Sequence, residues 1–173
     1  MNMLIFSDAS ADPQLKTGFG AYLVITDADM NTILTENTLK EKLKVKQFSS
    51  TSSTQLEIET ILCALQDLTL QQPASALINK VTVYTDSQGV IELPKRRTAL
   101  ELSDFAGRGN KRLKHDRLYQ TFYRMQDNIR FELKKLRGHN KRDGKTQLDE
   151  IFSYVDRAAR QALRNHLRQT FNS

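Results

Sequence analysis

Two short apolar runs in this chain each end on an aspartate. Residues 3–6 lead into Ser7 and Asp8, and residues 81–84 lead into Thr85 and Asp86. A run of this length between polar residues predicts a buried strand, and the carboxyl ends of such strands commonly hold the chemistry of an α/β protein. If the two strands are neighbours, the pattern predicts two carboxylates at one edge of a sheet.

The remaining pattern predicts a mixed sheet. Short connections between the first three strands favour antiparallel pairing, whereas the last two strands need helical crossovers and should run parallel. Alternating lysines from position 40 to 46 indicate a solvated strand end or edge. We therefore expect one α/β domain over residues 1–173, with a five-stranded mixed sheet flanked by helices. The expected strands are 3–9, 21–25, 32–39, 79–85 and 129–136, and the expected helices are 55–68, 87–93, 118–128 and 147–169.

The overall composition fits a polar globular protein. The chain has 173 residues, one cysteine (Cys63) and a mean hydropathy of −0.53. It contains no apolar run near the roughly 18–20 residues that span a bilayer, and it begins directly with a strand rather than a leader. A single cysteine excludes an internal disulfide. We expect a cytoplasmic protein without a membrane partner.

Charge divides the chain into two unlike parts. Residues 1–94 carry a net charge of −5, whereas residues 95–173 carry +11. The stretch 95–117 holds eight of the basic residues and only three acids. Acidic groups that hold cations beside basic groups that hold phosphates are typical of nucleic-acid enzymes. A solvated basic face is the simpler alternative for the second half.

The candidate acids also have simpler structural explanations. Asp86 at its strand end resembles a helix cap, Glu57 completes a Thr54-x-x-Glu57 capping box, and Asp156 fits the polar face of a long helix. Asp8, Glu57 and Asp86, however, converge if the first and fourth strands are adjacent. Clustered carboxylates repel one another unless a cation joins them, and an all-oxygen set favours Mg²⁺ or Mn²⁺ over zinc.

An ordered series of short motifs resembles type 1 ribonuclease H over nearly the whole chain. The series comprises Phe6-Ser7-Asp8-Ala9-Ser10, Thr17-Gly18-Phe19-Gly20-Ala21, Thr54-Gln55-Leu56-Glu57 with Ala64-Leu65, Tyr84-Thr85-Asp86-Ser87-Gln88, Arg137-Gly138-His139 and Val155-Asp156-Arg157-Ala158-Ala159-Arg160. The resemblance implies a ribonuclease H-like fold. It places the family's four metal-binding carboxylates on Asp8, Glu57, Asp86 and Asp156, and its catalytic loop histidine on His139. The competing positions are Glu59 for the second carboxylate, and Asp143, Asp149 and Glu150 for the fourth.

The resemblance implies a metal-dependent endonuclease. The family hydrolyses the RNA strand of RNA–DNA hybrids with two divalent ions, here Mg²⁺ or Mn²⁺, and leaves 5′-phosphate and 3′-hydroxyl ends. His139 is expected to transfer a proton or to assist product release. The chain is expected to be a monomer whose partner is the hybrid. Two alternatives stay open: a nucleic-acid-binding protein with weak or no catalysis, and a DNA nuclease of the same superfold.

The resemblance also suggests substrate contacts. The basic stretch 95–117 occupies the place of the family's basic handle, although its length and sequence differ. The chain has no tryptophan, so the family's stacking contacts are either absent or supplied by residues such as Phe105 or Tyr119. The expected nucleic-acid contacts are Ser52, Ser53, Thr54, Gln88, Lys95, Arg96, Arg97, Arg108, Lys111, Arg112 and Lys114.

Overall fold

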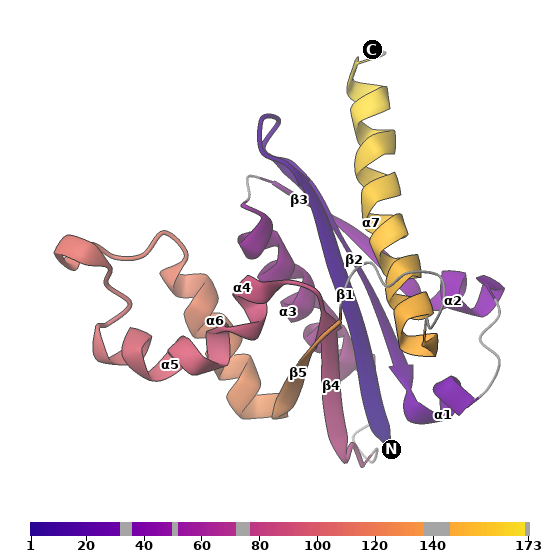
Figure 1. Cartoon of the computed structure of the whole chain (residues 1–173), viewed down its shortest axis with the longest axis horizontal. Coiled ribbons are helices and arrows are strands. Elements are labelled where there is room, and N and C mark those ends of the chain that lie inside the picture. Colours follow the sequence, from indigo (N-terminus) through magenta and orange to yellow (C-terminus); the bar gives the residue numbers. More distant parts are fainter. Residues whose placement is uncertain (32–35, 50–51, 72–76, 137–145, 172–173) are drawn as a thin grey trace.

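A computed structural model shows one five-stranded sheet with helices on both faces (Figure 1). It describes residues 1–31, 36–49, 52–71, 77–136 and 146–171. Within these ranges, no helix is both long and apolar enough to cross a membrane. The strands are β1 (Asn2–Asp12), β2 (Thr17–Thr26), β3 (Leu43–Ser49), β4 (Lys80–Thr85) and β5 (Phe131–Lys135). The helices are α1 (Asp27–Asn31), α2 (Glu36–Lys42), α3 (Ser53–Gln71), α4 (Gln88–Ile91), α5 (Leu93–Leu102), the 3₁₀ turn η1 (Arg108–Asn110), α6 (Asp116–Ile129) and α7 (Gln147–Phe171).

The sheet has the order β3-β2-β1-β4-β5. The pairs β1–β2 and β2–β3 are antiparallel, whereas β1–β4 and β4–β5 are parallel. The predicted fold class is therefore confirmed: three antiparallel strands are followed by two parallel ones. The strand β1 lies at the centre, so the strands ending near Asp8 and Asp86 are neighbours.

The third strand was predicted at the wrong place. Residues 32–39 were expected to form it, but positions 36–39 belong to α2 and the strand is β3, at 43–49. The prediction relied on the isolated apolar pair Ile33 and Leu34. Residues 32–35 lie outside the described part of the chain. The strand is indicated instead by the alternation of apolar residues and lysines from Leu43 onward, and Lys44 and Lys46 are typical of an edge strand.

The alternation along β1 assigns its side chains to two cores. Met3 and Ile5 pack with α3 and α6 on one face, whereas Phe6 packs with α7 on the other. Successive side chains of a strand point to opposite faces, so Asp8 shares the face of Phe6. The helix α7 covers that face (Figure 1), and the carboxylate of Asp8 therefore lies on the same side as the helix that carries Asp156.

Close approach of α3 to the sheet depends on Gly20 of β2. A Cβ built on this residue would lie 1.9 Å from the hydroxyl oxygen of Thr60 on α3, and 2.8 Å from its Cβ. Thr60 is fully buried and donates its hydroxyl to the carbonyl of Leu56. Any larger side chain at position 20 would therefore push back the helix that carries Glu57.

We expect Gly20→Ala to lower the free energy of unfolding by about 1–3 kcal/mol, the usual cost of overpacking a well-filled core. For a chain of this length the melting temperature should fall by roughly 3–10 °C. Thermal denaturation checks this, with Gly107→Ala as the control, since a Cβ there meets the flexible end of Leu113 at 3.2 Å and the carbonyl oxygen of Lys111 at an ordinary 3.7 Å. Equal losses in both variants would contradict the steric explanation.

Candidate active site

Two neighbouring strands bring Asp8 and Asp86 together. In the parallel register Phe6 lies opposite Tyr84, and their rings stack with centroids 5.0 Å apart. Each aspartate follows its aromatic residue by two positions, so both carboxylates leave the same end and the same face of the sheet. The stacked rings form an apolar floor beneath them.

The third carboxylate, Glu57, comes from the first turns of α3. Ser52 caps this helix, since its hydroxyl accepts the backbone N–H of Gln55. The capping-box alternative for Glu57 is therefore wrong, because Thr54 is already inside the helix. Glu57 is instead 7% exposed and lies under the strand ends. Its competitor Glu59 accepts a hydrogen bond from the side chain of Gln55.

These three carboxylates form one cluster. Oxygen atoms of Asp8, Glu57 and Asp86 all lie within 4.8 Å of one another. Asp8 and Glu57 are buried, while Asp86 is more open to solvent. The Oε2 atom of Glu57 is buried and has no hydrogen-bond partner among the described residues. An acceptor left in this state is costly, so the cluster lacks a positively charged or hydrogen-bonding component.

A fourth carboxylate approaches from α7. Asp156 lies close enough to Asp8 for a hydrogen bond between the two carboxyl groups that helps to raise the pKa of Asp8, and Arg160 holds Asp156 through an ion pair of 2.6 Å. The competitor Asp149 accepts hydrogen bonds from the backbone and hydroxyl of Thr146, at the start of α7. The two other expected positions, Asp143 and His139, lie outside the described residues.

Burial and mutual repulsion raise the pKa values of these acids. Burial raises the pKa of Asp8 to about 8, aided by the hydrogen bond to Asp156 and the charge of Asp86. Burial also raises the pKa of Glu57 to about 9, with smaller contributions from Asp8 and Asp86. The pKa of Asp86 is raised by burial and by Asp156. Without a cation, Asp8 and Glu57 hold their protons at neutral pH.

The cluster fits a divalent cation. It offers only carboxylate oxygens, and hard cations such as Mg²⁺ and Mn²⁺ prefer such ligands. One buried oxygen of Glu57 is unpartnered among the described residues. A bound cation would supply the missing charge and permit Asp8 and Glu57 to ionise. Asp8, Glu57, Asp86 and Asp156 are the residues that would hold it.

The start of α3 and the short helix α4 adjoin this cluster. A Cβ on Gly89 would lie 3.0 Å from Thr54, so the two elements are in close contact. Ser52 and Ser53 are exposed beside Thr54. Gln88 accepts a hydrogen bond from Lys135 of β5 and donates one to Glu92. These contacts position Gln88 at the carboxyl end of the sheet.

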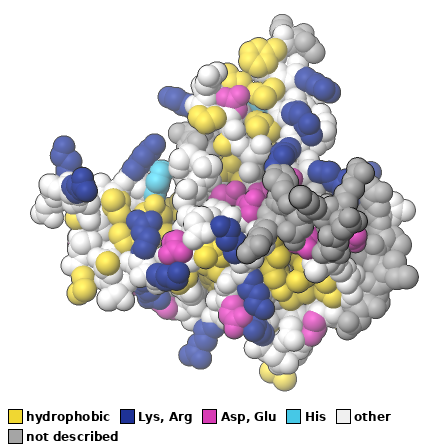
Figure 2. Space-filling view, in the orientation of Figure 1, with side chains coloured by type: hydrophobic (Ala, Val, Ile, Leu, Met, Phe, Trp, Pro, Cys, Tyr) yellow, Lys and Arg dark blue, Asp and Glu magenta, His cyan; other side chains and the backbone are white. Residues whose placement is uncertain are grey.

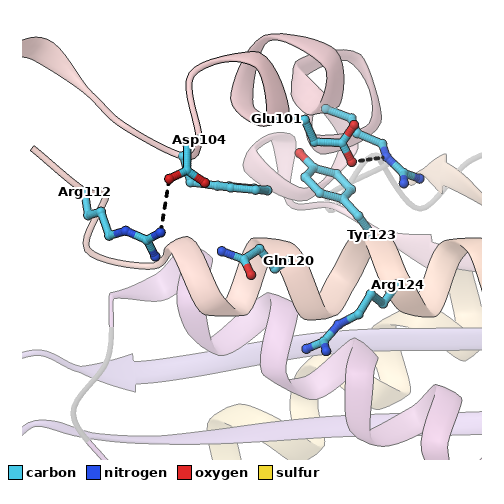
Figure 3. A pocket seen from close by; sticks show the side chains of 8 residues that line it. Glu101, Asp104, Arg112, Gln120, Tyr123 and Arg124 are labelled. Atoms are coloured by element: carbon cyan, nitrogen blue, oxygen red, sulfur yellow. Dashed lines mark hydrogen bonds and ion pairs between the residues drawn. The ribbon is translucent and has the colours of Figure 1, made fainter. Parts of the chain in front are cut away.

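The basic stretch 95–117 forms a packed projection, which includes most of α5 and the loop up to α6 (Figure 1). Arg97 makes two hydrogen bonds of 2.6 and 2.8 Å to Asp127 and one to Glu101. Arg112 pairs with Asp116 at 2.7 Å and with Asp104 at 3.2 Å. These residues surround a cavity of about 330 Å³, in which Gln120 rises from α6 (Figure 3). Arg97 and Arg112 therefore hold the projection together.

The proposed replacements for tryptophan are not accessible. Phe105 is 8% exposed and Tyr119 is 9% exposed, and both belong to the core beneath the projection. The guanidinium of Arg96 lies 5.7 Å from the centre of the Tyr119 ring. Neither ring therefore offers a free face to a base, and the suggestion that they stack on substrate is wrong.

The projection leaves a smaller set of cations free for ligands. Arg108, Lys111 and Lys114 are exposed and form no ion pair with any described carboxylate, whereas Lys95 pairs with Glu92 at 3.2 Å. Dark-blue side chains stand on this projection, away from the magenta group near the centre of the molecule (Figure 2). Within the stretch, these three residues are therefore candidates for phosphate contacts, as is the exposed Arg117.

Neutralising Arg108, Lys111 and Lys114 together should weaken binding of an RNA–DNA hybrid, the substrate that the sequence resemblance implies, and reduce the slope of log affinity against log salt by about 2–3. Arg112→Gln, by contrast, should mainly lower thermal stability, because it breaks the pairs with Asp104 and Asp116. Binding titrations at several salt concentrations measure the first effect. An unchanged slope in the triple variant would show that the projection is only a solvated surface.

Two residues near the cluster were not assigned a role from sequence. Arg160 orients Asp156, whereas Lys135 binds Gln88 and its charge partly opposes the rise in the pKa of Asp86. The spacing of four between Asp156 and Arg160 was a usable signal, because such positions adjoin on a helix. Lys135 had no local signal, since its contact depends on the pairing of β4 with β5.

Comparisons with known proteins agree with this architecture. The family model described as RNase H matches residues 1–164. The solution structure of the PFV RNase H domain has a TM-score of 0.57 and 17% identity, covering 92% of each chain. The foamy viral protease–reverse transcriptase in complex with RNA/DNA hybrid has a TM-score of 0.64 and 13% identity, covering 92% of this chain. The present chain corresponds to 19% of that larger protein. No curated protein matches the sequence.

Proposed function

Since the chain belongs to the RNase H family, we propose that it hydrolyses the RNA strand of RNA–DNA hybrids and leaves 5′-phosphate and 3′-hydroxyl ends. The observation that carries the proposal is the convergence of Asp8, Glu57 and Asp86, whose oxygens lie within 4.8 Å of one another. A protein that only binds nucleic acid would gain nothing from placing carboxylates beside phosphates, because the charges repel.

The nature of the substrate has separate support. A structural neighbour has been solved in complex with an RNA/DNA hybrid, and the fold is shared over most of this chain. The basic projection supplies exposed cations on one side of the acidic cluster. Phosphate contacts of this kind position a duplex without reading its sequence, which suits an enzyme that acts on any hybrid.

The acidic residues would hold two divalent ions, Mg²⁺ or Mn²⁺. When bound, these ions supply an activated water at neutral pH and neutralise charge on the departing 3′ oxygen. Asp8 is central in the cluster, between Asp86 of the adjacent strand and Asp156 of α7. Glu57 closes the buried side, and the more open Asp86 faces the approach of substrate. His139 is proposed to move a proton or to aid product release.

The protein's own contacts prepare this arrangement. The ion pair with Arg160 restrains Asp156, and the stacked rings of Phe6 and Tyr84 fix the strand ends that carry Asp8 and Asp86. Deprotonation of Asp8 and Glu57 must accompany cation loading, because burial holds their protons at neutral pH. Activity should therefore rise with pH until loading is complete.

The test is cleavage of a hybrid labelled on its RNA strand, with Mg²⁺ and with a chelator. We expect Mg²⁺-dependent fragments from the wild type and none from Asp86→Asn. Product ends are identified by their response to phosphatase and kinase. Equal cleavage by the wild type and Asp86→Asn would refute the enzyme proposal. Duplex DNA cut as fast as hybrid would instead indicate a DNA nuclease of the same fold.

A further inference from the structure

The second half of α7 carries a strong, uncompensated positive charge. Residues 157–171 include four arginines and no aspartate or glutamate. Arg157 stacks over the ring of Tyr154 and bonds back to the carbonyl of Ser153. The other three, Arg160, Arg164 and Arg168, recur every four residues. They therefore form a row that curves slowly around the helix.

The last turns of this helix project beyond the sheet (Figure 1). Leu163 is the last buried residue of α7, and Arg164 and Arg168 beyond it are exposed. The tilted contact between His166 and Phe19 of β2, at 5.5 Å, braces this arm. The match to the RNase H family model covers residues 1–164, so Arg168 lies beyond the matched region.

Electrostatics favours an anionic partner for the row. Arg160 is neutralised by Asp156 at 2.6 Å, but among the described residues Arg164 has a hydrogen bond only to the uncharged Gln161. Arg168 forms no ion pair with a described carboxylate. Like charges four residues apart destabilise a helix by about 0.2–0.5 kcal/mol per pair. A favourable helix dipole accounts for a cation in the last turn, at Arg168, but not for Arg164.

The row begins at the acidic cluster and leads away from it. Dark-blue side chains follow α7 upward from the central magenta group, on the same face of the molecule (Figure 2). From Arg160 to Arg168 the helix rises about 12 Å. This length corresponds to the axial rise of roughly three to four nucleotides in one strand of a duplex. A strand whose scissile phosphate lies at the acids would therefore pass the arm.

We propose that Arg164 and Arg168 bind backbone phosphates of the hybrid beyond the cleavage site, on the side opposite the basic projection. This inference rests on the proposed substrate and deepens it. The acidic cluster is then flanked by two phosphate-binding surfaces, the projection on one side and the helical arm on the other. Arg160 links the arm to the cluster through Asp156.

The experiment measures hybrid binding by fluorescence anisotropy in chelator, so that binding is separated from cleavage. The double variant Arg164→Gln/Arg168→Gln should lower the slope of log affinity against log salt by nearly 2. The loss of binding affinity in this variant, relative to the wild type, should become about tenfold smaller between roughly 50 and 200 mM salt. Arg164→Lys/Arg168→Lys should restore most of the slope, because the charge is kept.

The matched control is Lys40→Gln/Arg130→Gln, which also removes two exposed charges. Arg130 precedes β5 at the amino end of the parallel strands, opposite the acids, and Lys40 lies on α2. The control should keep the wild-type slope. An unchanged slope in the arm variant, or equal losses in the arm and control variants, would overturn the proposal. A wild type that binds hybrid but never cleaves it would refute the enzyme proposal alone, whereas one that does not bind hybrid would refute both.

Discussion

Glu57→Gln should lower the rate of hybrid cleavage by about 10²–10³-fold or more, the scale seen when one charged group that stabilises a transition state is removed. The reason is geometric, because Glu57 supplies a buried oxygen to the cluster that no other described group can replace. Glu59→Gln is the matched control, two residues along the same helix. Glu59 contacts Gln55 instead of the cluster, so this variant should stay within about twofold of the wild type.

Initial rates with the labelled hybrid and saturating Mg²⁺ measure both effects. Glu57→Gln should also retain its fold in chelator, because the protonated acid and the amide have nearly the same size and both are neutral. Loss of activity accompanied by unfolding would point to a structural role for Glu57. Strong loss in Glu59→Gln, with Glu57→Gln still active, would show that the cluster is not the catalytic centre.

The metal-free protein should lose stability as the pH rises. Asp8 and Glu57 have ordinary pKa values of 3.8 and 4.5, but in the folded state these rise to about 8 and about 9. The folded state therefore binds more protons than the unfolded state across this interval, and the free energy of unfolding falls with increasing pH. The loss begins near pH 4–5 and is complete above about pH 9. The two shifts together correspond to a loss on the order of 10 kcal/mol, so the melting temperature in chelator should fall by about 20 °C or more.

Mg²⁺ should reverse this trend, since it binds the ionised carboxylates and offsets their repulsion. Thermal denaturation at about pH 6 and about pH 9, with chelator or with saturating Mg²⁺, gives the four required values. The gain from Mg²⁺ should be larger at the higher pH. Asp8→Asn should be more stable than the wild type in chelator at high pH, whereas Glu59→Gln should behave like the wild type. A metal-free protein whose stability rises over this interval would contradict the raised pKa values.

Sequence patterns predicted those elements whose formation depends on the residues within the element itself. The apolar runs before Asp8 and Asp86 identified the two central strands, and the helical periodicity after Gln55 identified α3. Connection lengths then predicted which strands pair antiparallel and which run parallel. The convergence of the carboxylates could be anticipated because parallel neighbours end at the same edge.

The failures come from contacts that local patterns do not encode. The third strand lies at an edge with one partner and little burial, so its apolar signal was weaker than the misleading pair Ile33 and Leu34. Arginines of the projection were predicted to bind nucleic acid because of their charge. Arg97 and Arg112, however, form ion pairs with carboxylates of α5, α6 and the loop between them. Similarly, Phe105 could not be recognised as a buried residue, because the backbone folds around it only after α5 and α6 have packed.

The strand order also constrains how the protein acquires its activity. Asp8, Glu57, Asp86 and Asp156 are separated by long stretches of chain, and loop-closure entropy opposes such distant contacts. The hairpin of β1 and β2 can form early because its partners are close in sequence, whereas the pairing of β1 with β4 and the docking of α7 bring remote segments together. The acids therefore come together only when these remote segments pair. If the acids bind Mg²⁺ as proposed, Mg²⁺ present during refolding should act on that step and would then also favour completion of the fold.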